Sequence, residues 1–318
     1  MRIAICIGTF RREKLLRELL VGISRLTFRR NAALQITVII VDNDPLGSAQ
    51  DTCQAADFRF PLRYVIEPRR GIAHVRNRAV REAGAVDFLA FIDDDEIPSP
   101  EWLDELLWTH SEYKAEIVTG PVTPEFSAEV PEWIRKGRFF ERPEFQTGSL
   151  LEKCSTNNAL VSSEVFASVP GFDARFQLTG GEDTHFFLRA HRAGFRIAWS
   201  QEAVVHESIS IDRANLRWIL HRGIQVGNSW VLCEMSLDPR PQVRLLRFGK
   251  AAGHLLTGAA STPISLFRGR AAVTRSVRKT CLGAGMITGL FGHNYLAYDS
   301  PVTVPMKATA SLEGRTSS

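Results

Sequence analysis

The sequence predicts an α/β protein with a doubly wound, mostly parallel sheet flanked by helices. Three observations support this prediction. Apolar runs of strand length alternate with stretches of helical periodicity through residues 1–122. The run ITVIIVD is continuously apolar, as in strands that are buried on both faces. Polar residues follow directly after four of the apolar runs, and ligands of such sheets bind at these strand ends.

The elements of the first half can be assigned in order. Strands are expected over residues 2–7, 36–42, 62–67, 87–93 and 115–122. Helices are expected between them over residues 12–25, 46–57 and 72–84, and from about Ser99, with Ser99 as the N-cap and Pro100 at the first helical position. This β-α-β order implies parallel strands with helices on both faces of the sheet.

The second half of the chain is less regular. Residues 123–153 are rich in Pro, Phe and charged residues, and we expect an irregular segment over the ligand crevice. The elements expected next are a strand and short helix over 154–166, a glycine loop, helix and strand over 180–199, a short strand over 203–207 and a long helix over 212–234. Residues 241–298 then predict amphipathic helices without strands.

The net charge of +4 on this chain of 318 residues is unevenly distributed. From Ser236 onward there are 11 Lys/Arg and 3 Asp/Glu, which leaves a balance of −4 for residues 1–235. We therefore expect a doubly wound domain over 1–235, a basic amphipathic helical extension over 236–300 and a disordered tail over 301–318.

The basic extension predicts an anionic partner. Moderately apolar helices with Lys and Arg suit a membrane interface, where the cations lie near anionic headgroups. The alternative is a helical appendage that packs on the sheet. No nucleic-acid partner is expected, because the basic residues lack interleaved aromatic side chains on which bases could stack.

The five cysteines favour a reducing cytosol. They are widely spaced and include no Cys-x-x-Cys, so neither a disulfide framework nor a zinc site is expected. The apolar run at the N-terminus is too short for a signal peptide and is better explained as a buried strand. No stretch has the roughly 20 strongly apolar residues of a transmembrane helix.

Four consecutive carboxylates, Asp93 to Glu96, follow the apolar run FLAFI. In an extended backbone, Asp93 and Asp95 point to one side, while Asp94 and Glu96 point elsewhere. Two carboxylates on one side suit a hard divalent cation such as Mg²⁺, which also binds substrate phosphates. The alternative is a solvated acidic turn. A calcium loop is disfavoured because the required glycine and distal glutamate are missing, and a prenyl-diphosphate motif is disfavoured by Ile97.

Six stretches in order resemble the family 2 glycosyltransferases with the GT-A fold, of the bacterial polysaccharide-building kind. They are CIGTFRREKLLRELLVGI, IIVDNDP, RRGIAHVRNRAV, FLAFIDDDEIPSPEWL, STNNALVSSEVF and GGEDTHFFLRAHRAGFRI, and they span about residues 3–210. The resemblance implies transfer of a sugar from a nucleotide-diphospho-sugar, commonly a UDP-sugar, with inversion at the anomeric carbon. It makes residues 1–235 the nucleotide-sugar glycosyltransferase domain, with a lipid-linked or glycan acceptor in cell-surface polysaccharide synthesis.

The resemblance also implies which residues bind the nucleotide-sugar. Thr9 and Asp42 match positions that contact the nucleotide base. Arg76 and Asn77 match an Ala-Arg-Asn element that borders the nucleotide, although Val75 replaces its usual small residue.

The acidic cluster is expected to complete the donor site. Asp93 matches a position near the ribose and metal, and Asp94 belongs to the same nucleotide-sugar-binding set. Asp95 matches the direct ligand of a Mg²⁺ or Mn²⁺ on the diphosphate, where a metal offsets charge on the departing nucleotide. A late histidine completes the metal site in several relatives, so His206 is a third candidate ligand, with a structural histidine as the alternative.

Glu182 and Asp183 match the Glu-Asp motif of the family at the start of a helix. Inversion needs a base that takes the proton from the attacking hydroxyl group. We expect Asp183 to be this base, with Glu182 as the second candidate. The alternative is a helix-capping pair, but the preceding Gly180-Gly181 favours close approach to a ligand. His185 stands where relatives commonly have an acid.

Processive relatives carry Gln-x-x-Arg-Trp, which the segment Asn215-Leu216-Arg217-Trp218 resembles only weakly. Addition of a single sugar is therefore expected. The protein is expected to be cytoplasmic and bound peripherally to the inner face of the plasma membrane.

Two other functions stay open. A nucleotidyltransferase would need a glycine-rich phosphate loop where this chain has GTFRREK. An inactive glycan- or nucleotide-binding protein is disfavoured by the intact Asp93, Asp95 and Asp183.

Overall fold

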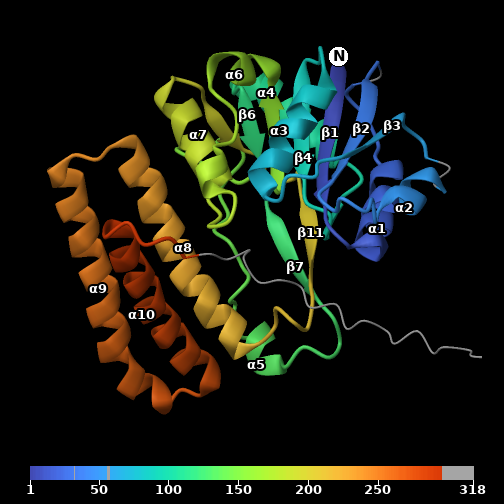
Figure 1. Ribbon diagram of the computed structural model, residues 1–318. Coiled ribbons are helices and arrows are strands. Elements are labelled where there is room, and N and C mark those ends of the chain that lie inside the picture. Colours follow the sequence, from blue (N-terminus) through green and yellow to red (C-terminus); the bar gives the residue numbers. More distant parts are fainter. Residues whose placement is uncertain (32, 56–57, 296–318) are drawn as a thin grey trace, which may run out of the picture.

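A computed structural model describes residues 1–31, 33–55 and 58–295 (Figure 1). Its large sheet has the strand order β3-β2-β1-β4-β9-β6-β10-β8. The strands, in that order, are Leu62–Ile66, Gln35–Asp42, Arg2–Thr9, Phe88–Ile92, Asn158–Ser162, Ile117–Thr119, Ile197–Trp199 and Leu150–Leu151. Strands β1 to β4 pair in parallel, as do β6 and β10, whereas β8 and β9 are antiparallel to their neighbours. The predicted doubly wound, mostly parallel sheet is confirmed.

Alternate side chains of β1 point into two separate hydrophobic cores, one on each face of the sheet, and helices cover both faces. Ile3, Ile5 and Ile7 enter one core with α1 (Glu13–Ser24), α2 (Gln50–Gln54) and α4 (Trp102–Tyr113). Ala4 and Cys6 enter the other core with α3 (Ile72–Ala83), α6 (Ser163–Ser168) and α7 (Glu182–Arg192). Both cores end at the carboxyl edge of the strands. This edge holds the polar residues at the strand ends, such as Thr9, Asp42 and Asp93.

A second, three-stranded sheet was not predicted. Its order is β5 (Glu96–Pro98), β11 (Val205–Ile209) and β7 (Val122–Phe126). The single strand expected over 115–122 is wrong, because it divides into β6 and β7, which belong to different sheets. The chain turns at Gly120, where a Cβ atom would overlap the carbonyl oxygen of Ala203. Strands of two or three residues are too short to show a period of two, so the sequence did not reveal β5 or β8.

Two other expectations need correction. Helix α4 begins at Trp102 with Glu101 as N-cap, and the Ser99 carbonyl accepts the N–H of Trp102 at 3.0 Å instead of Ser99 capping the helix. The irregular segment over 123–153 contains β7, the short helix α5 (Glu132–Arg135) and β8. The tail expected over 301–318 lies outside the described residues.

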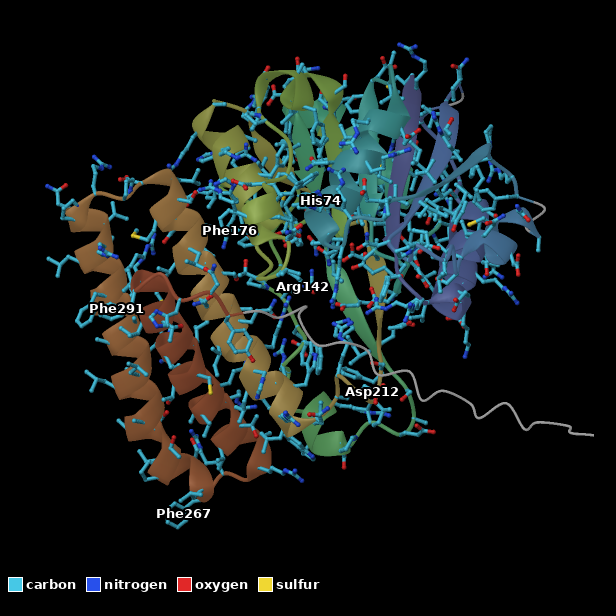
Figure 2. The ribbon with its side chains drawn as sticks, viewed as in Figure 1. His74, Arg142, Phe176, Asp212, Phe267 and Phe291 are labelled. Carbon is cyan, nitrogen blue, oxygen red and sulfur yellow. The ribbon has the colours of Figure 1, made fainter. Side chains whose placement is uncertain are left out.

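Three long helices form a bundle beside the sheet (Figure 1): α8 (Leu216–Leu237), α9 (Pro241–Leu266) and α10 (Arg270–Leu290). Helix α10 packs against both α8 and α9, and α8 also contacts α7. Helix α8 therefore belongs with the bundle although it begins before Ser236. Phe267 and Phe291 lie at the outer edge of the bundle (Figure 2). Within the described ranges, no helix has the length and apolar content needed to span a bilayer.

Glycines allow close packing between α8 and α10, because a Cβ on Gly285 would overlap the Ile224 carbonyl oxygen. We expect Gly285→Ala to lower the free energy of unfolding by about 3 kcal/mol in urea denaturation, since the backbones must separate. Gly253→Ala is the control, because Gly253 lies on α9 with open space around its Cβ position. It should stabilise the protein by about 0.5–1 kcal/mol through helix propensity. Equal effects of the two substitutions would contradict the close approach.

Candidate functional site

The carboxyl ends of β1 and β4 are joined by a hydrogen bond. The Thr9 hydroxyl, at the end of β1, donates to Asp94 Oδ2 at 2.8 Å. Beside this bond, α3 lies very close to β1, since a Cβ on Gly8 would be 2.6 Å from Val75 Cγ1. Val75, which replaces a usual small residue, therefore fits because Gly8 has no side chain.

The acidic residues form a turn, with the Glu96 N–H donating to the Asp93 carbonyl at 3.2 Å. Because the backbone is not extended here, the expected alternation is wrong for Asp94. Asp94 and Asp95 both accept hydrogen bonds from Arg12 Nη1, at 2.8 and 3.2 Å. Glu96 does point away, as expected: it is buried and accepts from the Asp93 N–H and from Asn157 Nδ2, both at 2.9 Å.

A second guanidinium group holds the same turn. Arg213 Nη1 donates to Asp95 Oδ2 at 3.0 Å, and Arg213 Nη2 also pairs with Glu207 on β11. Burial and the neighbouring Asp93 raise the pKa of Asp95 to about 6. Burial alone would raise the pKa of Glu207, but Arg213 and Arg142 outweigh it and lower that pKa. The turn is thus a compact region in which carboxylates and guanidinium groups alternate.

Arg12 and Arg213 were not predicted as site residues. Arg12 lies in the segment GTFRREK between β1 and α1, and Arg213 lies in the turn before α8. The sequence offered one signal for them: each of the two basic residues follows shortly after a predicted strand. Sequence alone does not pair them, because their partners lie 82 and 118 residues away in the chain.

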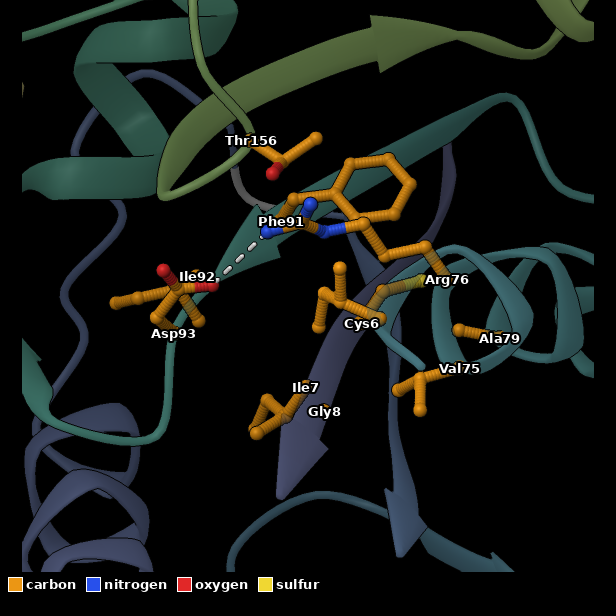
Figure 3. A pocket seen from close by; sticks show the side chains of 11 residues that line it. Cys6, Ile7, Gly8, Val75, Arg76, Ala79, Phe91, Ile92, Asp93 and Thr156 are labelled. Carbon is orange, nitrogen blue, oxygen red and sulfur yellow. Dashed lines mark hydrogen bonds and ion pairs between the residues drawn. The ribbon is translucent and has the colours of Figure 1, made fainter. Parts of the chain in front are cut away.

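Arg76 connects the acidic turn to the start of α7. Its Nη1 donates to Glu182 Oε1, and its Nη2 lies 3.5 Å from Asp93 Oδ1, as Figure 3 shows for the side chain reaching from α3. The Asp93 side chain is 42% exposed and, with Gly8, Arg76 and Thr156, lines the pocket at this edge of the sheet, which we call the crevice, whereas Glu182 is buried. Burial, opposed by Arg76, raises the pKa of Glu182 to about 7.

Asp183 is the more accessible acid of the Glu-Asp pair. It is half-buried at the second position of α7, and its Oδ1 accepts the Thr184 N–H at 2.6 Å. A further residue that sequence reasoning missed is Lys153, whose Nζ lies 2.9 Å from the centre of the Trp230 ring. Burial lowers the pKa of Lys153 to about 8, opposed by the carboxylates of Glu234 and Asp183. Lys153 therefore connects this end of the crevice to α8.

Two predicted site residues, Asp42 and Asn77, are held by hydrogen bonds within the fold, and a third, His206, lies beside an acid outside the acidic turn. Asp42 is fully buried and accepts three hydrogen bonds at 2.9 Å, from the N–H groups of Asp44 and Ala49 and from the Tyr64 hydroxyl. Asn77 holds the backbone of Phe172 through bonds of 2.7 and 2.9 Å. His206 Nδ1 lies 3.0 Å from Glu125 Oε1.

The structure thus does not bring His206 together with Asp93 and Asp95, the other two expected ligands of one metal. Glu207, the next residue on β11, is the one that joins the acidic turn through Arg213. Side chains alternate along a strand, which explains why the neighbour of Glu207 points away. Among the residues that can be described, no group of three His, Cys, Asp or Glu side chains converges on one point.

His185 is buried on α7 and packs against Phe176, with ring centroids 4.8 Å apart. Burial, and then the nearby Arg189, lower its pKa from 6.5 to about 4. Between these values the unfolded chain binds a proton that the folded chain does not, so stability falls as the pH falls. Between pH 7 and pH 5, the free energy of unfolding should therefore fall by about 2 kcal/mol more for the natural protein than for His185→Gln. Parallel curves in urea denaturation would show that His185 is solvated.

Comparison with known proteins identifies the family. The profile of the family described as glycosyl transferase family 2 matches residues 4–169, and that of glycosyl transferase family group 2 matches residues 88–282. The chain is 33% identical to the succinoglycan biosynthesis protein ExoM of Rhizobium meliloti (strain 1021) over 300 residues, which cover 92% of this chain and 94% of ExoM. It is 25% identical over 208 residues to a glucosyl-dolichyl phosphate glucuronosyltransferase of Haloferax volcanii, covering 60% of this chain and 65% of that protein.

Solved structures agree on the fold. The mannosyltransferase PcManGT from Pyrobaculum calidifontis, in complex with GDP-Man and Mn²⁺, matches with a TM-score of 0.63 at 16% identity, over 91% of this chain and 87% of that one. Residues 1–349 of S. aureus TarS, in complex with UDP, match with a TM-score of 0.52 at 15% identity, over 93% of both chains. These structures support the GT-A fold. Because the family profile and the similarity to ExoM each cover more than half of the sequence, the chain belongs to glycosyl transferase family 2.

Proposed function

We propose that this protein is a metal-dependent, inverting glycosyltransferase that moves one sugar from a nucleotide-diphospho-sugar, a UDP-sugar in the first instance. One observation carries the proposal. Arg76 contacts both the acidic turn after β4 and the Glu-Asp pair that begins α7, so the proposed donor and acceptor groups border one crevice. The solved structures that hold UDP, or GDP-Man with Mn²⁺, support a nucleotide-sugar donor and a divalent cation.

The acidic turn fits a cation that is shared with a diphosphate. Asp93 and Asp95 offer hard oxygen ligands, and Asp93 is open to the crevice. Asp95 would exchange Arg12 or Arg213 for the cation, since it contacts both guanidinium groups. A bound Mg²⁺ or Mn²⁺ would supply Lewis-acid stabilisation of the leaving diphosphate. Because Mg²⁺ commonly uses one or two carboxylates plus substrate phosphates, His206 is not needed for this fit.

We assign the base to Asp183. It is half-buried in the first turn of α7, where the partial positive charge of a helix N-terminus favours an acidic side chain. A carboxylate in this form takes the proton of the attacking hydroxyl group. Glu182 is less suited, because it is buried against Arg76 and its pKa is raised to about 7.

The acceptor we propose is a lipid-linked or glycan intermediate of cell-surface polysaccharide synthesis. The similarity to a protein named for succinoglycan biosynthesis supports this choice. A lipid-linked acceptor would be met at the inner face of the plasma membrane by a peripherally bound cytoplasmic enzyme. The basic helices after Ser236 support this location, since they match an anionic surface.

A thermal-shift panel of nucleotide-sugars, each with and without Mn²⁺ or Mg²⁺, tests the donor and the metal together. We expect a UDP-sugar with a divalent cation to raise the melting temperature more than the two added separately. At a concentration of 100 times the Kd, one ligand should stabilise the folded state by about 2.7 kcal/mol. Equal shifts with and without the cation would contradict metal dependence. Release of pyrophosphate from a nucleoside triphosphate and a sugar phosphate would instead support a nucleotidyltransferase.

A further inference from the structure

Helix α9 has its large apolar side chains on the outside of the molecule. With the smaller Ala252 and Pro263 they form what we call the apolar stripe, whose members recur at intervals of three, four or seven residues: Leu245, Phe248, Ala252, Leu256, Pro263 and Phe267. Ala252 is half-buried, and Phe267 is the C-cap residue of α9. The exposed fractions of Leu245, Leu256 and Phe267 are 72%, 71% and 93%. At 1.5 Å per residue, the stripe is about 33 Å long.

The opposite side of α9 carries small residues. Ala251, Gly258 and Ser265 are buried, seven residues apart, and face α10. An ordinary surface helix places its large apolar residues toward the core and polar residues toward water. Helix α9 has the reverse arrangement, and Figure 1 shows it as the bundle helix farthest from the sheet. Exposed apolar patches of this extent indicate an interaction surface.

The charges around the stripe indicate what it contacts. Residues 239–298 contain nine Lys/Arg and no Asp or Glu. Residues 251–267, from the middle of α9 to its C-cap Phe267, contain no Lys or Arg, and the exposed Lys250 and Arg268 lie directly before and after this segment. An apolar strip bordered by cations matches a bilayer surface with anionic headgroups, where apolar side chains reach the acyl boundary and cations meet phosphates.

The same charges disfavour a second copy of this chain. Pairing two apolar stripes would bring two sets of cations together without any acid between them, and like charges across an interface are costly. We infer that α9 lies in the plane of an anionic phospholipid bilayer, with the apolar stripe inserted at the boundary of headgroups and acyl chains. This inference rests on the proposed membrane partner of the function above and identifies the surface that would contact it.

The attachment of α9 to the rest of the protein makes the orientation specific. Arg247 on α9 pairs with Glu234 on α8, and Arg244 Nη2 donates to the Leu290 carbonyl of α10. Helix α8 in turn holds Trp230, which lies under Lys153 near Asp183. A bilayer bound along α9 would therefore hold the whole crevice in one orientation relative to the membrane.

Co-sedimentation of the full chain with vesicles tests this surface. The vesicles are phosphatidylcholine alone, or phosphatidylcholine with phosphatidylglycerol. The main variant combines Leu245→Gln, Leu256→Gln and Phe267→Gln, and a second variant combines Lys250→Glu and Arg268→Glu. The matched control is Leu46→Gln, since Leu46 is 85% exposed in the turn after β2, away from the bundle. Melting temperatures of all variants should match the natural protein, because every altered side chain is exposed.

We expect the natural protein and Leu46→Gln to bind the anionic vesicles equally, and both other variants to bind about tenfold more weakly or less. Binding of the natural protein should also weaken as the NaCl concentration is raised, because salt screens the attraction between the cations and the headgroups. This tests the electrostatic contribution without any substitution. Full binding by the triple variant would overturn the inference, as would equal binding to neutral vesicles. A dimer in analytical ultracentrifugation that the triple variant dissociates, without vesicle binding, would assign the stripe to a second copy instead.

The donor thermal shift, measured on the same variants, separates this inference from the proposed function. It should be unchanged in both bundle variants, because α9 is the bundle helix farthest from the sheet (Figure 1). If the natural protein does not bind vesicles but shows the donor thermal shift, only the membrane inference is overturned. Vesicle binding without any donor shift would leave the stripe in place and reject the proposed donor.

Discussion

Asp183→Asn is expected to retain nucleotide-sugar binding and to reduce sugar transfer by about 10³-fold. The amide of Asn cannot take the proton of the attacking hydroxyl group. Loss of a general base commonly lowers the rate by about 10²- to 10⁴-fold. The Thr184 N–H that now bonds Asp183 Oδ1 can bond the amide oxygen, so the start of α7 should keep its geometry. The measurement is incorporation of radiolabelled sugar into the lipid and glycan fractions of cells that make the protein.

Glu182→Gln is the matched comparison for this experiment. Its amide oxygen can still accept from Arg76, and the substitution removes a carboxyl group that is already buried. We expect a smaller loss of transfer, with donor binding unchanged. Transfer at nearly the natural rate in Asp183→Asn, together with a large loss in Glu182→Gln, would move the base to Glu182.

Asp95→Ala is expected to weaken the metal-dependent part of nucleotide binding by at least about 100-fold, because a carboxylate that would hold the cation is removed. Binding of UDP without metal should not fall. Arg12 and Arg213 lose one acidic partner but keep Asp94 and Glu207, so the crevice becomes more positive toward a diphosphate. Isothermal titration of UDP, with and without Mn²⁺, measures both quantities.

The control for Asp95→Ala is Asp238→Ala, which also removes a carboxylate paired with an arginine, Arg240, but does so at the end of α8. It should leave both affinities unchanged. If Asp95→Ala binds UDP with Mn²⁺ as tightly as the natural protein, the cation is not held at the acidic turn. The cation would then have to bind at a site other than the pair Asp93 and Asp95.

Much of the fold follows from local patterns. The alternation of apolar strands with helices at a period of 3.6 predicted β1 to β4 and α1, α3, α7 and α8 within a few residues. The end of each strand was visible as well, because a buried strand must stop where polar residues begin. The carboxyl edge of the sheet was therefore predicted as the site.

The contacts within the site were harder to predict. Asp42 and Asn77 stand in stretches that match the family, yet the structure gives both of them hydrogen bonds to backbone groups of the fold. A hydrogen bond between distant residues depends on how loops fold over the sheet, which has no periodic signal. For the same reason, Arg213 and Lys153 became visible as crevice residues only in three dimensions.

The sequence by itself determined the family, the doubly wound sheet and the place of the acidic cluster, since each depends on residue order over short stretches. The tertiary structure decided that Asp94 and Asp95 share Arg12, because a turn replaced the extended backbone. It also decided which side of α9 is exposed. The sequence contains both small and large apolar residues there, and only packing against α10, which needs small side chains, turns the large ones outward.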